Sequence, residues 1–211
     1  MILVDALHWI AENQASFFGA FRQHLALCVV SLLIGAIIAI PLGFAVAHSP
    51  RAAFVAVNFV GAFRAIPSLA ILAAMLPILG IGFLPSVIAL VVLAIPPMLL
   101  NTMTGVREID PAIIDAASGM GMDRRERLLQ VELPLAVPPI IAGLKTASIQ
   151  LIGGAALASF IGGGGLGDFI NTGIAIMDMA RLLVGAVPIA LLAIATELLL
   201  SGLERLARQR G

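Results

Sequence analysis

Tyrosine is absent from this 211-residue sequence, and tryptophan and cysteine each occur once. The single cysteine, Cys28, excludes a disulfide framework and a thiol-rich metal site. Charged residues make up 11% of the chain, against about 25% in soluble globular proteins, so an ordinary soluble domain is a poor interpretation. The 12 basic and 12 acidic residues cancel, and the net charge therefore gives no basis for attraction to nucleic acid.

Long hydrophobic runs take the place of the missing charge, since 61% of the residues are apolar. A helix needs about 20 mostly apolar residues to cross the hydrocarbon of a bilayer. The sequence therefore predicts an all-α, polytopic membrane protein with about five transmembrane helices in one domain, residues 25–203. The expected spans cover residues 25–47, 52–79, 84–106, 133–160 and 182–203.

Two of these spans, 52–79 and 133–160, are longer than the bilayer requires. At about 1.5 Å of rise per residue, each must tilt, break or extend beyond the membrane. Proline removes a backbone donor and clashes with the preceding turn. Pro67 and the pair Pro138-Pro139 are therefore the expected break points.

Residues 1–24 are expected to lie outside the membrane-spanning domain, because polar side chains interrupt them too often for a span. Apolar residues between Ile2 and Ile10 recur at near-helical spacing, which favours an amphipathic helix on the outer membrane surface. A frayed tail is the alternative. At the other end, residues 204–211 are expected to form a tail.

Residues 107–132, here called the charged block, carry ten of the 24 charged side chains. Such a segment cannot rest in hydrocarbon, so it must lie on one aqueous side between two spans. Asp110-Pro111 fits an N-cap followed by proline at the first position of a short helix. Gly119 and Gly121 then permit a turn before a second short helix, which is expected from Asp123 to about Gln130.

The charged block resembles the cytoplasmic signature of ATP-binding-cassette (ABC) importer permeases. In that signature an acidic residue and two alanines are followed, after three residues, by glycine. Nine more residues lead to an aliphatic residue, any residue, leucine and proline. The matching residues here are Asp115, Ala116, Ala117, Gly121, Val131, Leu133 and Pro134. Asp115 stands where glutamate is usual, and Val131 where isoleucine is usual.

The resemblance implies the type I ABC importer permease architecture, with the charged block as a coupling helix docked on a separate ATPase. Arg124 and Arg125 would orient that partner, which would hold ATP and magnesium. No catalytic residue, cofactor or metal is then expected in this chain. The glycine-rich run 162–167 has no following lysine, so it is not a phosphate-binding loop. It is expected to be a bend that leads to a short re-entrant or interfacial piece, residues 168–179. A solvated loop that only fixes topology is the alternative role for the charged block.

Two further segments, RAIPSLA (residues 64–70) and FIGGGGLGDF (residues 160–169), resemble the branch that imports osmoprotectants such as glycine betaine, choline or carnitine. This likeness implies an external substrate-binding protein, a second permease chain, identical or paralogous, and the bacterial inner membrane. Quaternary ammonium groups are usually held over several Trp or Tyr rings, which this chain lacks. Selection should therefore occur in the binding protein. Another small solute, such as an amino acid, is the alternative substrate.

Three ionisable residues fall at membrane depth, where they must face the protein interior or a watery path: Arg64, Lys145 and Glu197. Arg64, Pro67 and Ser68 are expected to line the translocation path, because transporters build paths from broken helices. The alternative is an internal ion pair of Glu197 with Arg64 or with Lys145, or side chains that extend to the membrane surface from a misplaced span.

The distribution of basic residues predicts the orientation. With five spans, eight arginines fall on the side of the charged block and the C-terminus, and only Arg22 and Arg181 fall on the other side. The charged block and the C-terminus are therefore expected in the cytoplasm, and the N-terminus outside.

Two other classes of protein compete with this interpretation. Gly165-Leu166-Gly167-Asp168 matches the G-x-G-D pattern of intramembrane aspartyl proteases, but no second aspartate lies within a span. A secondary transporter driven by an ion gradient would explain the three ionisable residues at membrane depth. It would leave the spaced signature of the charged block without a role.

Overall fold

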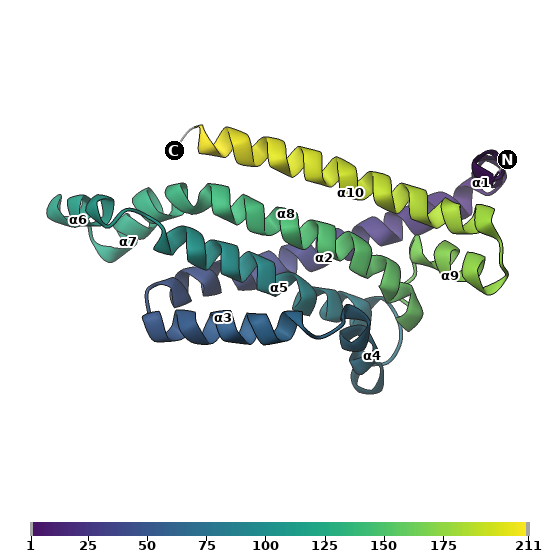
Figure 1. Ribbon diagram of the computed structural model, residues 1–211, viewed down its shortest axis with the longest axis horizontal. Helices are drawn as coiled ribbons and strands as arrows, with labels where there is room; N and C mark the ends of the chain where they lie inside the picture. The colour runs from purple at the N-terminus through teal and green to yellow at the C-terminus, as the bar shows by residue number, and fades with distance from the viewer. Residues whose placement is uncertain (1, 210–211) are drawn as a thin grey trace.

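The computed structural model describes residues 2–209, and every regular element in that range is a helix (Figure 1). A single turn of π-helix (Leu128–Glu132) and one of 3-10 helix (Ser159–Ile161) lie directly before and after the long helix of residues 133–158. The α-helices are α1 (Ile2–Glu12), α2 (Gln14–Ala47), α3 (Pro50–Arg64), α4 (Ser68–Leu79), α5 (Phe83–Arg107), α6 (Pro111–Gly119), α7 (Arg124–Arg127), α8 (Leu133–Ala158), α9 (Gly167–Ala175) and α10 (Met179–Arg208).

Four helical runs are long and apolar enough to cross a membrane: α2, α5, the run from α7 through α8, and α10. The pair α3 and α4 makes a fifth when the bent pair is counted as one span. The predicted all-α architecture with about five spans is therefore confirmed. The first span differs in length, since α2 is already helical from Gln14, well before residue 25.

Helices α2, α5 and α8 form the centre of the bundle. Leu27, Leu90 and Leu151, one from each helix, are fully buried. Gly43 lets α2 approach α5 closely, because a Cβ atom at Gly43 would lie 2.7 Å from the Cβ of Thr102. Small residues at such contacts bring helix backbones together in membrane proteins.

The expected break at Pro67 is confirmed. Helix α3 ends at Arg64, α4 begins at Ser68, and the two helices are bent by 90°. The carbonyl oxygen of Pro67 accepts the backbone N–H of Ala70 at 2.9 Å, so this residue begins the new helix. The residue before a proline avoids the helical conformation, which explains why α3 stops short of it.

The expected break at Pro138-Pro139 is wrong, because α8 runs without interruption from Leu133 to Ala158. The reason is packing. A Cβ atom at Gly105 of α5 would collide with the ring of Pro139, and one at Gly143 would lie 3.1 Å from the Cα of Met98. The close contact with α5 favours a continuous α8 despite the missing backbone hydrogen bonds.

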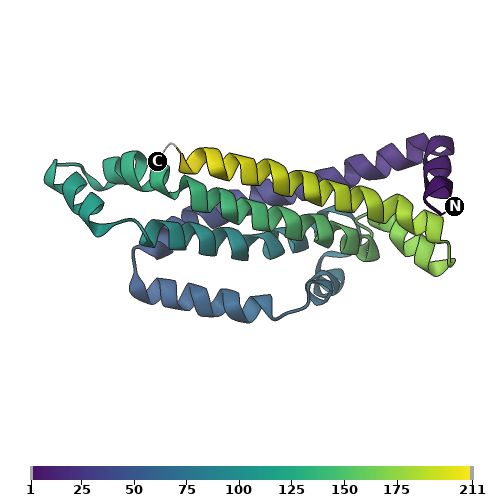
Figure 2. The same ribbon diagram turned by 45° about the horizontal axis from the view of Figure 1, so that its top comes forward.

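Helix α1 crosses the end of the bundle that lies opposite α6 and α7 (Figure 2). Ala6 is buried there, and the ring of Trp9 meets the ring of Phe169 edge-on at 5.1 Å. The guanidinium of Arg181 lies 4.9 Å from the centre of the Trp9 ring. Residues 2–12 are therefore an ordered helix and not a frayed tail. Its place at a membrane surface stays a prediction.

The glycine-rich run after α8 is a bend, as expected. Gly162, Gly164 and Gly165 have φ values of 75°, 72° and 88°, which side chains with a Cβ rarely adopt. The bend leads directly into the short helix α9, which packs against α10 through Gly173 and Gly185. This matches the short piece predicted between the last two spans.

Candidate functional site

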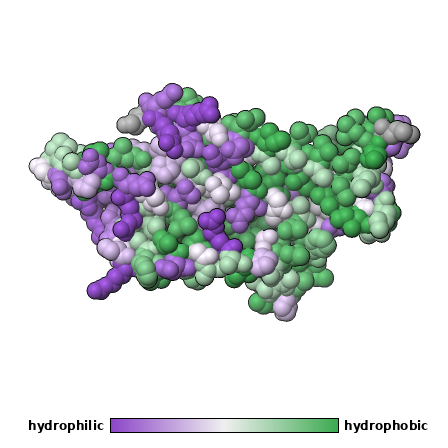
Figure 3. Space-filling view, in the orientation of Figure 1, coloured by the Kyte–Doolittle hydropathy of each residue, from purple (hydrophilic) through white to green (hydrophobic). Residues whose placement is uncertain are grey.

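The charged block lies at the end of the bundle, and α6 and α7 project beyond the long helices (Figure 1). Hydrophilic residues gather at this end of the molecule, whereas hydrophobic residues cover much of the opposite half (Figure 3). The last turns of α10 lie at the same end. This uneven distribution is what a membrane protein with one polar end would show.

Helix α6 begins as the sequence predicts. The side chain of Asp110 accepts the backbone N–H of Ala112 at 2.9 Å, and Pro111 occupies the first helical position. Both features satisfy or remove backbone donors that have no partner at a helix start. The start of α6 is therefore fixed by local sequence.

Gly121 ends α6 with a left-handed residue, φ 83°. Its N–H donates to the carbonyl of Ser118 at 3.0 Å, and the N–H of Met122 donates to the carbonyl of Ala117 at 3.2 Å. These two bonds form a Schellman motif, in which glycine is favoured at the left-handed position. The glycine of the predicted signature is thus required by the turn between the two short helices. Gly119, by contrast, is simply the last residue of α6.

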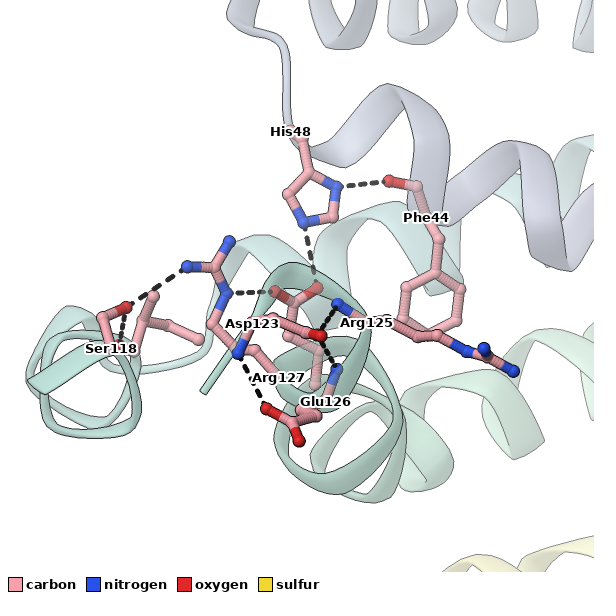
Figure 4. Close-up of polar contacts among 9 residues, drawn as sticks. Phe44, His48, Ser118, Asp123, Arg125, Glu126 and Arg127 are labelled. Carbon is pink, nitrogen blue, oxygen red and sulfur yellow. Dashed lines mark hydrogen bonds and ion pairs between the residues drawn. The ribbon is translucent and has the colours of Figure 1, made fainter. Parts of the chain in front are cut away.

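Helix α7 starts with a complete capping box. Asp123 accepts the N–H of Arg125 and Glu126 at 2.7 and 2.8 Å, and the Glu126 carboxylate accepts the N–H of Asp123 at 2.9 Å (Figure 4). The second helix was predicted from Asp123 to about Gln130. It continues instead through the π-helical turn into α8, so the second half of the charged block is a direct extension of a span.

The residues of the predicted signature lie in three positions. Asp115 and Ala116 are exposed on α6, whereas Ala117 is buried at 2% exposure and anchors the helix. Arg124 and Arg125 are exposed on α7. Val131, Leu133 and Pro134 lead from the π-helical turn into α8 and connect the exposed part to the core. The structure therefore brings an exposed face and a connection to the core together in one segment.

A polar cluster beneath this face was missed by the sequence analysis. Glu132 is only 4% exposed, and its carboxylate accepts hydrogen bonds from Arg127 Nε at 3.2 Å and His48 Nε2 at 2.9 Å. Arg127 also donates to Ser118 Oγ at 3.3 Å (Figure 4). His48 and Glu132 are 84 residues apart, so no local pattern joins them. The available signal was a carboxylate placed immediately before an apolar span.

The candidate path residues lie at the bend between α3 and α4. Arg64 ends α3, Pro67 and Ser68 begin α4, and Arg64 and Pro67 are exposed. The bend lies at a distance from the charged block along the bundle (Figure 1). Arg64 makes no ion pair with another residue in the range 2–209.

Lys145 pairs with acidic residues of α10. Its Nζ lies 2.9 Å from Glu204 and 3.8 Å from Glu197, and it donates to Ser201 Oγ at 3.3 Å. The internal ion pair between Lys145 and Glu197 that the sequence left open is therefore present. Within the described part of the chain, no group of three or more His, Cys, Asp or Glu side chains could hold a metal ion.

Residues 23–209 match the family described as binding-protein-dependent transport system inner membrane component. The chain belongs to this family. It is the permease component of an ABC transport system, and such components are transport subunits and not enzymes. This membership decides against the aspartyl protease and the ion-driven carrier as classes.

Curated relatives match over nearly the whole chain. The glycine betaine/carnitine/choline transport system permease protein OpuCB of Bacillus subtilis is 40% identical over 90% of this chain and 87% of its own length. The choline transport system permease protein OpuBB of the same species is 40% identical over 94% and 92%. The osmoprotectant import permease protein OsmW of Salmonella typhimurium is 33% identical over 99% of both chains.

Solved structures share the fold. An inward-facing form of the MetNI methionine ABC transporter has a TM-score of 0.83 at 24% identity, with 93% of this chain and 98% of that chain covered. At this identity the likeness concerns the fold alone. It confirms the expected type I importer permease architecture.

Proposed function

We propose that this chain forms the translocation path of an ATP-driven importer for a small osmoprotectant such as glycine betaine, choline or carnitine. The names of relatives that match 90% or more of the chain support this substrate class. The observation that carries the ATP-driven part is the charged block, which presents the signature residues on a projecting, capped pair of short helices.

The exposed face of the charged block is the docking surface for a separate ATPase subunit. Small residues at Ala116 and Gly121 allow a partner surface to approach closely, since nothing lies within 4 Å of a Cβ atom at Gly121. Arg124 and Arg125 orient the partner by charge. ATP and magnesium act in that subunit. Its ATP-bound form can move this chain only if it fits one permease conformation better than the other.

Arg64, Pro67 and Ser68 contribute to the path for the solute. An exposed arginine at membrane depth is costly against lipid, so it faces water or another protein surface. A second permease chain, identical or paralogous, provides that surface and completes the path. An extracytoplasmic binding protein delivers the solute, because this chain has no tyrosine and only one tryptophan with which to hold a quaternary ammonium group.

The charged block and the end of α10 lie in the cytoplasm, and residues 1–24 lie outside. The uneven distribution of arginines supports this orientation. Arg210 belongs to the counted side, and together with Met1 and Gly211 it falls outside the described residues. A biotin-maleimide label on a cysteine introduced at Ser118 should react from the cytoplasmic side only, in a Cys28→Ala background.

The test uses the complete complex. The tagged chain is expected to co-purify with an ATPase and, in vesicles, to take up one of the three osmoprotectants with ATP hydrolysis. Methionine serves as the alternative solute. The variant Arg124→Glu/Arg125→Glu should lower solute-stimulated hydrolysis at least about tenfold, which corresponds to ~1.4 kcal/mol.

Arg205→Glu is the matched control, because Arg205 is exposed in the last turn of α10 and lies outside the signature. Its coupled uptake should stay close to wild type. Normal coupled uptake in the double variant, at normal membrane levels, contradicts the docking role. Uptake by the purified chain alone, driven by an ion gradient, contradicts the whole proposal.

A further inference from the structure

The buried carboxylate of Glu132 is the most unusual polar group at the base of the charged block. A buried charge is costly unless it is paired and hydrogen-bonded. Here both carboxylate oxygens are satisfied, one by Arg127 at 3.2 Å and the other by His48 at 2.9 Å. Glu132 therefore ties two segments together that are distant in sequence.

The ring of His48 is held on both sides. Its Nε2 faces Glu132, and its Nδ1 lies 2.7 Å from the carbonyl oxygen of Phe44. Contacts with a carboxylate on one side and a carbonyl on the other fix the direction of this side chain.

His48 lies at the turn between α2 and α3. It caps the C-terminus of α2, and the next residue, Ser49, caps the N-terminus of α3 by accepting the N–H of Ala52 at 3.3 Å. Helix α3 then leads directly to the 90° bend at Pro67. A displacement of His48 therefore acts on the first turn of the helix that ends at the candidate path.

The other end of the cluster reaches the docking face. Arg127 donates to Glu132 through Nε and to Ser118 of α6 through a terminal nitrogen at 3.3 Å. Four side chains, here called the polar relay, thus connect α6 to the turn between α2 and α3 (Figure 4): Ser118, Arg127, Glu132 and His48.

The surroundings of the polar relay permit movement. A groove of about 420 Å³ opens between α2 and the base of α7, lined by Phe44, His48, Arg124 and Leu128 among others. The turn that carries Glu132 is π-helical, a distortion that is frequent at functional sites in helices. A rigid, fully packed junction would have neither feature.

We propose that Glu132, with His48 and Arg127, is a positioning residue for energy coupling. The polar relay transmits displacement of α6 to α3 and so to the bend at Pro67. This inference rests on the proposed docking of α6 on an ATPase. Spatial continuity alone does not establish coupling, so the test measures coupling directly.

The experiment compares ATP hydrolysed per solute taken up by the complete complex in vesicles. Glu132→Gln keeps the shape of the side chain and removes its charge. This variant should raise the ratio about three- to thirtyfold, because hydrolysis continues while transport falls. Glu108→Gln is the matched control, since Glu108 is an exposed carboxylate of the charged block that makes no ion pair within residues 2–209.

Variants of His48 separate positioning from folding. His48→Ala should raise the ratio as Glu132→Gln does, and His48→Gln, whose amide nitrogen can replace Nε2, should restore it in part. The double variant Glu132→Gln/His48→Ala should be no worse than either single variant, because both break one connection. Additive effects, or a wild-type ratio in His48→Ala, overturn the inference.

The amount of ATPase that co-purifies identifies a merely structural role. The inference is overturned if every relay variant loses the ATPase and the complexes that still assemble hydrolyse as much ATP per solute as wild type. Absence of coupled hydrolysis in the wild-type complex contradicts the proposed function itself, so the two failures are distinguishable. If Glu132→Gln does not fold, the partly exposed His48 still supplies the deciding variants.

Discussion

In α3 and α4 the chain bends by 90° around one proline, whereas in α8 two consecutive prolines lie within a continuous helix. The local chemistry of proline is the same in both places. The surroundings differ: Phe54 and Phe59 of α3 are 71% and 67% exposed, whereas Ala147 and Leu151 of α8 are fully buried. The uninterrupted α8 is closely packed on α5, whereas the bend at Pro67 lies where α3 and α4 are sparsely packed.

This difference separates a rigid centre from an arm that can move. Helices α3 and α4 have few buried residues, and regions of this kind need the least free energy to rearrange locally. Four predictions test the comparison, beginning with the largest expected effect.

Gly105→Leu should destabilise the bundle most. Its side chain would enter the space filled by the ring of Pro139, and overpacking of this kind costs about 1–3 kcal/mol or more. We expect little folded protein in detergent and a lowered melting temperature. Gly61→Leu on α3 is the matched control, because nothing lies within 4 Å of a Cβ atom there, and equal destabilisation of both variants would contradict the comparison.

Pro67→Ala should lower coupled uptake about tenfold, an effect of ~1.4 kcal/mol, while the melting temperature stays near that of wild type. Alanine favours the helical conformation at the bend, and this substitution weakens the separation of α3 from α4. Uptake and thermal unfolding are measured on the same preparation. Unchanged uptake would remove the bend from the transport cycle.

Lys145→Met should destabilise the contact between α8 and α10. The carboxylate of Glu204, only 14% exposed, would then keep Arg208 as its one cationic partner within residues 2–209. Loss of one partner from a partly buried pair costs about 1–3 kcal/mol. The melting temperature reports this loss, and Glu197→Gln, which breaks the longer 3.8 Å contact, should change it less.

Pro138→Ala should have the smallest effect. Alanine restores a backbone donor within an already continuous helix and leaves the contact of Pro139 with Gly105 in place. Uptake should match wild type, and the melting temperature should stay equal or rise. A loss of uptake comparable to that of Pro67→Ala would mean that α8 also bends during transport.

Much of this fold follows from local sequence signals. The spans come from hydrophobic length, the start of α6 from Asp110-Pro111, and the turn after it from Gly121, which must adopt a positive φ. Each of these features is decided within a few residues. For that reason the signature of the charged block and the break at Pro67 were predictable.

The remainder depends on tertiary contacts. The continuity of α8 depends on its contact with Gly105 of α5. The sequence at residues 138–139 does not predict that contact. The bond between His48 and Glu132 joins residues 84 positions apart. Sequence reasoning could flag Glu132 as a carboxylate beside a span, but only the packed bundle supplies its partners.

Helix α1 precedes the family match, which begins at residue 23, although the OsmW relative aligns over 99% of this chain. Ala6 and Trp9 of α1 nevertheless cover Phe169 and Arg181, which belong to the shared part of the chain. Helix α1 thus shields apolar and cationic surface of α9 and of the first turn of α10 that would otherwise meet solvent or lipid. A variant that begins at residue 23 would lack this helix. It should therefore associate through the apolar surface that becomes exposed there.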